Sequence, residues 1–190
     1  MLTIARPTIV LFAFLSFITG VLYPFTVTVI AQVAFPHQAN GSLIRENDRA
    51  VGSKLIGQPF DNPRYFFSRP SATSPAPYNG LGGSGSNLAT TNPALLEAVR
   101  ERVSRLKAAD PDNAAEIPID LVTTSASGLD PHISPAAARY QAARVARQRG
   151  LSRESVDELI RKNTQPPTLG FIGQPRVHVL NLNRALDAAK

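Results

Sequence analysis

Asp130, His132 and Ser134 alternate in the segment Gly-Leu-Asp-Pro-His-Ile-Ser. A carboxylate beside an imidazole could share a proton or bind a metal ion. A metal site needs about three or four ligands, and the other two histidines, His37 and His178, are distant in the sequence. Asp before Pro is also common in turns, and a serine can cap a helix. We therefore favour a structural role for this segment and predict no metal site.

A glycine-rich run at residues 80–87, Gly-Leu-Gly-Gly-Ser-Gly-Ser-Asn, is the second candidate site. Exposed backbone N–H groups in such a run could bind an anion. The run lacks the Gly-Lys-Ser/Thr of a P-loop and does not open a helix directly after a strand. We favour a flexible turn over a nucleotide site. The residues that a nucleotide or anion could contact here are Gly82, Gly83, Ser84, Gly85, Ser86 and Asn87.

Nucleophilic catalysis has little support in the sequence. The absence of cysteine excludes thiolate catalysis, disulfides and Cys-ligated metals. Ser84, Ser86 and Ser127 could act as nucleophiles only beside an oriented base, and no Gly-x-Ser-x-Gly motif is present. We therefore expect no catalytic residue in this chain.

The charge distribution argues against a nucleic-acid partner. The net charge is +6, with 20 Lys and Arg against 14 Asp and Glu. The arginines are interleaved with acids, as in Glu97, Arg100 and Glu101, and no basic block contains aromatic residues. This pattern is typical of solvent-exposed helix faces.

Residues 7–34 contain no charged residue and no histidine. About 28 residues would reach ~42 Å as a helix, enough to cross a ~30 Å hydrocarbon core with some tilt. A cleaved signal peptide would have a shorter apolar core. We predict a cytoplasmic N-terminus at residues 1–6, a single transmembrane helix at 7–34 and an extracytoplasmic soluble domain at 35–190. Arg6 favours this orientation.

Ser16, Gly20 and Pro24 recur every four residues and so share one face of the predicted helix. Small residues at this spacing allow another helix to approach closely. Pro24 cannot donate a hydrogen bond to the carbonyl of Gly20, which favours a kink. We predict that this face packs against a partner in the membrane.

The rest of the sequence predicts a mixed α+β domain with an irregular loop at residues 71–92. Tyr65, Phe66 and Phe67 are predicted core residues. The predicted elements are a strand pair within 43–56 with a turn at Asn47-Asp48, a helix from Pro93 capped by Asn92, a strand at 117–123, a helix from Pro135 to Gly150 with an alanine-rich inner face, a helix capped by Ser152, a strand at 176–182 and a last helix containing Leu186.

Several stretches together form a pattern that extends over most of the chain. They are VGSKLIGQPF (51–60), YFFSRPSA (65–72), GSNLATTNPAL (85–95), SGLDPHISPAAARYQAARVARQRG (127–150) and LGFIGQPRVHVLNLNRALD (169–187). This pattern resembles the small C subunit of the Kdp complex, the bacterial ATP-driven potassium transporter. That family's loop usually reads Gly-Pro where this chain has Ala89-Thr90, which weakens a binding role for those two positions.

The resemblance implies a single-pass, non-pumping accessory subunit in the bacterial inner membrane. Its implied partners are a channel-like potassium-translocating subunit and an ATP-hydrolysing P-type subunit, with potassium as the cargo. It also implies a catalytic chaperone that helps assembly and raises the ATP affinity of the P-type subunit, with ATP as a ligand. In the predicted orientation, however, the loop at 80–87 lies away from cytoplasmic ATP.

Two alternatives stay open. The domain could cap the ion-entry side of the channel-like subunit without contacting nucleotide. The chain could also be a membrane-anchored extracytoplasmic enzyme that uses Asp130 and His132.

Overall fold

The structure is a computed structural model that describes residues 2–189. Met1, the first residue of the predicted cytoplasmic N-terminus, and Lys190, the last of the predicted soluble domain, lie outside the described residues. The chain forms two compact units, Met1–Val51 and Gly52–Lys190.

The first unit consists mainly of one long apolar helical run. Its parts are α1 (Leu2–Phe17), a π-helical turn η1 (Ile18–Leu22) and α2 (Tyr23–Ala34). The stretch Ile4–Ala34 is long and apolar enough to cross a membrane, and its most apolar part has no side chain buried against the rest of the chain. The predicted N-terminal apolar helix is therefore confirmed, and its length and composition suit a membrane span.

The π-helical turn lies directly before Pro24, where the sequence predicted a local distortion. Tyr23 donates its N–H to the carbonyl of Ile18, five residues earlier. A π-turn of this kind accommodates a backbone that proline prevents from forming the regular i→i−4 bond. The structure therefore has a widened turn before Pro24, where the sequence predicted a kink.

Several threonines of the helix bond to its own backbone. Thr19, Thr26 and Thr28 each donate a hydrogen bond of 2.8 Å to the carbonyl four residues earlier. Hydrocarbon offers no alternative partner to a hydroxyl group, so internal bonding lowers the cost of placing these residues in a membrane.

A short helix and a β-hairpin follow the apolar run. They are α3 (Pro36–Ala39), β1 (Leu43–Glu46) and β2 (Arg49–Ser53). Asn47 and Asp48 connect the strands with positive φ angles of 47° and 61°, as a tight hairpin turn requires. The predicted strand pair and turn are confirmed, although the second strand ends at Ser53 and does not include Leu55 or Ile56.

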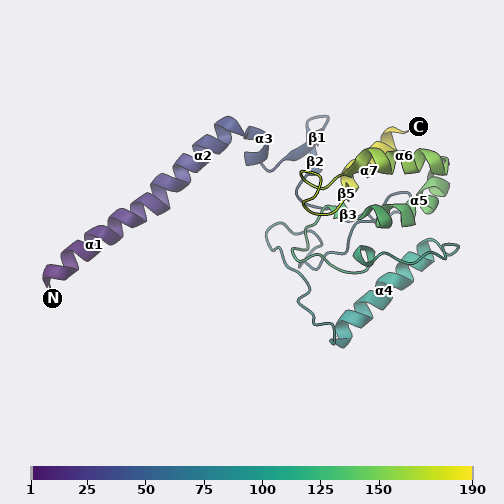
Figure 1. Ribbon diagram of the computed structural model, residues 1–190, viewed down its shortest axis with the longest axis horizontal. Coiled ribbons are helices and arrows are strands. Elements are labelled where there is room, and N and C mark those ends of the chain that lie inside the picture. The colour runs from purple at the N-terminus through teal and green to yellow at the C-terminus, as the bar shows by residue number, and fades with distance from the viewer. Residues whose placement is uncertain (1, 190) are drawn as a thin grey trace. The chain divides into compact units, whose positions relative to one another are not determined.

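The second unit combines helices with a small antiparallel sheet (Figure 1). Its strands pair in the order β3-β5-β4. The elements are α4 (Pro93–Ala109), the 3-10 turn η2 (Ile119–Leu121), β3 (His132–Ile133), α5 (Pro135–Arg149), α6 (Arg153–Asn163), β4 (Thr164–Gln165), β5 (Arg176–His178) and α7 (Val179–Ala188). The predicted mixture of helices and strands is confirmed.

Side-chain caps fix where the helices begin. Asn92, Ser134 and Ser152 accept backbone N–H groups at the starts of α4, α5 and α6. Gly150 ends α5 with φ +66°, a left-handed conformation that costs glycine little. These four boundaries agree with the sequence predictions.

The predicted strand at residues 117–123 is wrong. The segment forms η2, and the alternation that suggested a strand does not give a buried face, since Ile119 is exposed. Pro118 sets φ at −61° before the turn, and the amide of Val122 bonds back to Ile119. Local turn bonds therefore replace strand pairing here.

The predicted strand at 176–182 is correct only at its start. β5 ends at His178, whose ring caps α7 by accepting the N–H of Asn181. Val179, Leu182 and Leu186 are buried at helical spacing, so the apolar period of this segment belongs mainly to a helix.

The alanine-rich face of α5 lies in the centre of the second unit. Four of its alanines are buried (Ala137, Ala138, Ala142 and Ala146). Their small side chains allow close approach by neighbouring elements, including the buried Phe66 and Phe67. Both phenylalanines were predicted core residues and this is confirmed, whereas Tyr65 is only partly buried.

Candidate functional site

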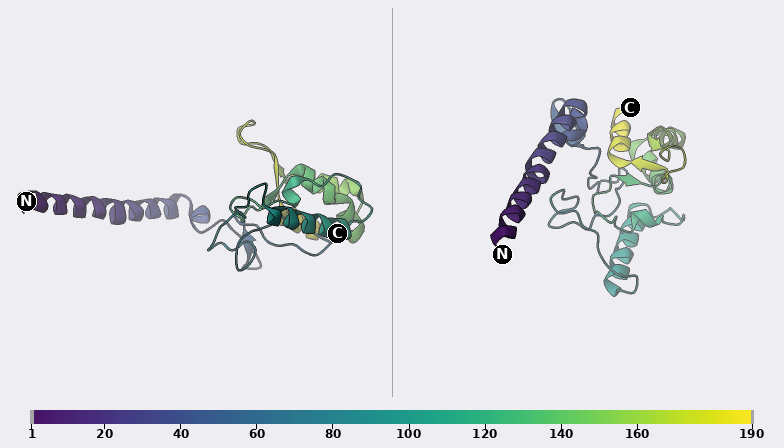
Figure 2. Two further views of the ribbon diagram at one scale, coloured as in Figure 1. Left: turned by 90° about the horizontal axis from the view of Figure 1, so that it is seen from below. Right: turned by 60° about the vertical axis from the view of Figure 1, so that its left-hand side comes forward.

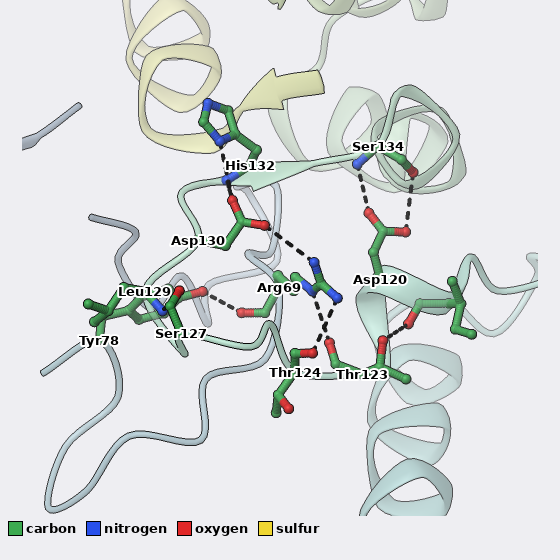
Figure 3. Close-up of polar contacts among 11 residues, drawn as sticks. Arg69, Tyr78, Asp120, Thr123, Thr124, Ser127, Leu129, Asp130, His132 and Ser134 are labelled. Carbon is green, nitrogen blue, oxygen red and sulfur yellow. Dashed lines mark hydrogen bonds and ion pairs between the residues drawn. The ribbon is translucent and has the colours of Figure 1, made fainter. Parts of the chain in front are cut away.

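Asp130 lies at the centre of a polar cluster in the second unit (Figure 3). One carboxylate oxygen, Oδ1, accepts the backbone N–H of His132 at 3.0 Å and lies 3.2 Å from the Nδ1 atom of the same residue. The other oxygen, Oδ2, pairs with the Nη1 atom of Arg69 at 3.3 Å. The structure thus brings the predicted Asp130 and His132 together and adds Arg69, which the sequence analysis did not single out.

Arg69 connects loops that are far apart in the sequence. Its Nε and Nη2 atoms donate to the carbonyls of Thr123 and Thr124, each at 3.2 Å (Figure 3). Its own carbonyl accepts the hydroxyl of Tyr78. Burial raises the pKa of Tyr78 to about 12, so this hydroxyl keeps its proton and remains a donor at neutral pH. Arg69 therefore acts as a structural link between three irregular segments.

The pKa of Asp130 lies below its ordinary value as a balance of opposing effects. Burial would raise it, but hydrogen bonds from the side chain and backbone of His132 and the positive charge of Arg69 outweigh burial. The carboxylate is thus held in its charged form at neutral pH. A general acid would need the opposite shift.

Ser134 and Asp120 form a neighbouring pair. Asp120 accepts the N–H of Ser134 at 2.7 Å and its hydroxyl at 3.2 Å, and the same hydroxyl oxygen accepts the N–H of Ala137. This arrangement fixes the start of α5 and also anchors η2. Ser134 is therefore bonded as a helix cap rather than aligned with a base.

An open groove of about 530 Å³ runs over these residues. Its polar lining includes Arg69, Asp120, Asp130 and His132. Among residues 2–189, no group of three His, Asp or Glu side chains is arranged to hold a metal ion. Arg69, Asp130 and His132 bond to one another and to backbone groups, and Asp120 bonds to Ser134. This geometry supports the structural role that the sequence favoured for the segment.

His178 lies beside His132, although the sequence analysis set it aside as distant. The two residues pair across β3 and β5, and their ring centroids are 5.3 Å apart in an edge-on arrangement. Both ring nitrogens of His178 have partners: Nε2 lies 3.2 Å from the carbonyl of Lys54, and Nδ1 accepts from Asn181 at 3.3 Å. A neutral ring that donates from Nε2 satisfies both contacts.

We expect the second unit to lose stability as the pH falls below about 6.5, the ordinary histidine pKa. His178 is only 2% exposed, and its pKa is lowered by burial and by the neighbouring His132. The unfolded chain therefore binds the proton first as the pH falls. The melting temperature of the full chain in detergent, measured between pH 7.5 and 5.5, checks this.

His178→Asn provides the matched variant for the pH measurement. Asparagine can still cap α7 through its side-chain oxygen, but it does not titrate. Its melting temperature should vary less with pH over the same range, even if the variant is less stable throughout. An identical pH dependence in both proteins would show that His178 is not the group responsible.

The glycine-rich run at residues 80–87 belongs to a longer segment, 54–92, that contains neither helix nor strand. Two of its glycines lie against the loop at residues 126–129. A Cβ atom on Gly85 would lie 2.9 Å from the carbonyl oxygen of Ala126, and one on Gly83 would lie 3.3 Å from the side chain of Leu129. Close packing between two loops explains glycine at these positions without an anion, and contact between residues 82–87 and a ligand stays a prediction.

A second hollow, of about 280 Å³, lies between the segment 59–78 and α4. Arg102 and Arg105 line it together with Phe67. Arg102 donates to the carbonyl of Val122 at 2.8 Å, and Arg105 pairs with Asp61. The sequence analysis treated the arginines of this region only as part of exposed helix faces. Their positions depend on loop contacts that helical periodicity does not reveal.

Comparison with known proteins identifies the family. The family model described as "KdpC: K+-transporting ATPase, c chain" matches residues 5–188. The chain belongs to this family. The C-subunit resemblance noted in the sequence is therefore confirmed, and the KdpC match includes both the apolar helix and the second unit.

Curated relatives agree with the KdpC assignment over full length. Three of them are named "Potassium-transporting ATPase KdpC subunit". The protein of Sorangium cellulosum is 58% identical and the alignment covers 100% of both chains. That of Polaromonas naphthalenivorans is 60% identical, covering 100% of this chain and 97% of the relative. That of Variovorax paradoxus is 58% identical, covering 98% and 96%.

Proposed function

We propose that this chain is a non-pumping accessory subunit of a potassium-transporting ATPase in the bacterial inner membrane. The observation that carries the proposal is the joining of an exposed apolar helix, Ile4–Ala34, to a folded unit in a chain that matches the KdpC family over residues 5–188. The proposed partners are a channel-like potassium-translocating subunit and an ATP-hydrolysing P-type subunit. The N-terminus would be cytoplasmic and the second unit extracytoplasmic.

The described contacts support a role in assembly better than catalysis or nucleotide binding by this chain itself. The carboxylates of Asp120 and Asp130 are bonded to Ser134, His132 and Arg69. Gly83 and Gly85 lie against a neighbouring loop. We therefore infer that any increase in the ATP affinity of the pump subunit is transmitted through contacts between subunits. A cap over the ion-entry side of the channel-like subunit is compatible with the same contacts.

Gly20→Leu is expected to weaken assembly with the membrane partners. A Cβ atom added to Gly20 would have no neighbour within 4 Å. A leucine there would therefore fill the helix face that Gly20 shares with Ser16 and Pro24. Leucine is favourable in lipid, so the helix itself should be retained, but a close approach by a second helix would be blocked. The fraction of this chain that co-purifies with the larger subunits should fall several-fold.

Leu22→Phe is the matched control, because it adds bulk two residues along the helix and away from the Gly20 face. It should co-purify like the unchanged chain.

Apparent affinities for ATP and potassium, measured on the complexes that remain, distinguish the two accessory roles. The chaperone role predicts a change in the ATP affinity, and the cap role predicts a change in the potassium affinity. Unchanged assembly of Gly20→Leu would contradict the proposed packing face.

A further inference from the structure

The segment between α6 and α7 carries an exposed apolar tip. Residues 163–175 contain no charged side chain. Leu169, Phe171 and Ile172 are 79%, 77% and 51% exposed. The left view of Figure 2 shows this segment, in yellow-green, projecting from the helices of the second unit. Isolated exposed apolar residues are ordinary, but three on one projecting turn are typical of an interaction site.

The backbone of this tip forms a closed hairpin. Thr168 and Ile172 exchange two N–H···O bonds of 2.9 Å, and the amides of Gly170 and Phe171 bond to Pro167 and Thr168. Gly170 takes the positive φ of +84° that the turn requires. Because the amides of Thr168, Gly170, Phe171 and Ile172 are already paired, the tip can enter an apolar recess with most of its backbone donors satisfied.

An apolar groove of about 650 Å³ lies at the base of the hairpin. Ile160 and the rings of several prolines form its apolar lining (Pro135, Pro166, Pro167 and Pro175). Arg139, Asp157 and Arg161 also line it. A projecting apolar tip beside an apolar groove with a charged rim matches the usual anatomy of protein–protein contacts.

The charges near the base favour a protein over a lipid surface. Arg161 and Lys162 pair with Glu158 at 2.7 and 3.5 Å, and Arg153 pairs with Asp157 at 3.0 Å. These three cations are therefore partly neutralised, and among the described residues Arg139 is the only cation of the groove lining without an ion pair. Binding to anionic headgroups depends on clustered, uncompensated positive charge, which a single arginine does not supply. Paired charges of both signs suit the polar rim of a protein interface instead.

We propose that the apolar hairpin, residues 166–175, docks into an apolar recess on another subunit of the same potassium-transporting ATPase. The inference deepens the proposed accessory function and rests on it. It assigns the second unit its own contact with the complex, separate from packing by the membrane helix. Phe171 and Leu169 are the side chains that enter the recess.

Site-directed cross-linking tests the docking directly. The chain contains no cysteine, so Phe171→Cys introduces its only thiol. A benzophenone maleimide attached there in the assembled complex should, on illumination, join this chain to one larger subunit. Ser104→Cys on the exposed face of α4 is the control and should give little of that product. Cross-links from position 171 to lipid alone, or no more protein product than from position 104, would overturn the proposal.

A polar substitution supplies an independent readout. Leu169→Ser with Phe171→Ser should raise the rate at which this chain is lost from the immobilised complex by about tenfold. Leu81→Ser is the matched control, since Leu81 is 101% exposed and lies outside the hairpin. Equal loss rates for the two variants would contradict the docking role. If the unchanged chain does not co-purify with larger subunits, the proposed accessory function is wrong. If the unchanged chain co-purifies and the hairpin variant is lost from the complex no faster, only the docking inference is wrong.

Discussion

Asn183→Leu is expected to lower the free energy of unfolding by about 2–4 kcal/mol. Asn183 is 1% exposed, and its side chain bonds both backbone groups of the buried Phe66: Oδ1 accepts the N–H at 2.9 Å and Nδ2 donates to the carbonyl at 3.1 Å. Leucine has a similar size but no polar atoms. The substitution therefore leaves a donor and an acceptor buried without partners.

Gln141 makes the same kind of contact with the next residue, Phe67. Its Oε1 accepts the N–H of Phe67 at 2.7 Å, and its Nε2 donates to the carbonyl at 3.3 Å. Arg144 stacks over the Phe67 ring at 4.0 Å and donates to Gln141. Burial lowers the pKa of Arg144 to about 10, so it still carries a charge at neutral pH. The side-chain amides of Gln141 on α5 and Asn183 on α7 thus make the backbone hydrogen bonds that a neighbouring strand would otherwise make to Phe66 and Phe67.

Urea unfolding of the full chain in detergent, followed by circular dichroism, measures the effect of Asn183→Leu. Asn181→Ala is the control. It lies two residues earlier on α7, and within residues 2–189 the structure describes no hydrogen bond made by its side chain. This variant should change the free energy by less than about 1 kcal/mol. If Asn183→Leu were as stable as the control, the amide contacts with Phe66 would not be important for the fold.

The local features of the second unit were predictable because their causes are local. Asn92, Ser134 and Ser152 cap helices through bonds that span two or three residues. Gly150 ends α5 through its own backbone conformation. The alanines of α5 repeat at helical spacing, which indicates a closely packed face. In each case a few neighbouring residues determine the structure.

The features that were missed depend on contacts between distant residues. β3, β4 and β5 are only two or three residues long, too short for alternation to identify. Their pairing places His132 beside His178. Arg69 is positioned by Asp130 and by the carbonyls of Thr123 and Thr124, more than fifty residues along the chain. No local pattern records such partners, so the candidate site was predicted only in its Asp130–Ser134 segment.

Gly128→Ala is expected to destabilise the second unit by about 2–4 kcal/mol. Gly128 has φ +68°, a conformation that alanine adopts with strain. Its added Cβ would also lie 2.5 Å from the carbonyl oxygen of Ser84 and 2.7 Å from the Cγ2 atom of Thr73. The first neighbour is backbone, so two loops would have to move apart.

Gly82→Ala separates loop packing from ligand binding in the glycine-rich run. A Cβ on Gly82 would have its nearest neighbour at 3.6 Å, an ordinary contact, so this variant should unfold within about 0.5 kcal/mol of the unchanged chain. If the run binds a nucleotide through its backbone, Gly82→Ala should also alter the ATP dependence of the assembled complex, although the stability of the chain is unchanged. If loop packing is the reason for the glycines, Gly128→Ala should reduce stability and Gly82→Ala should change neither property. Urea titration of both variants, with ATP titration of the complex containing Gly82→Ala, decides between a packed structural loop and an anion site.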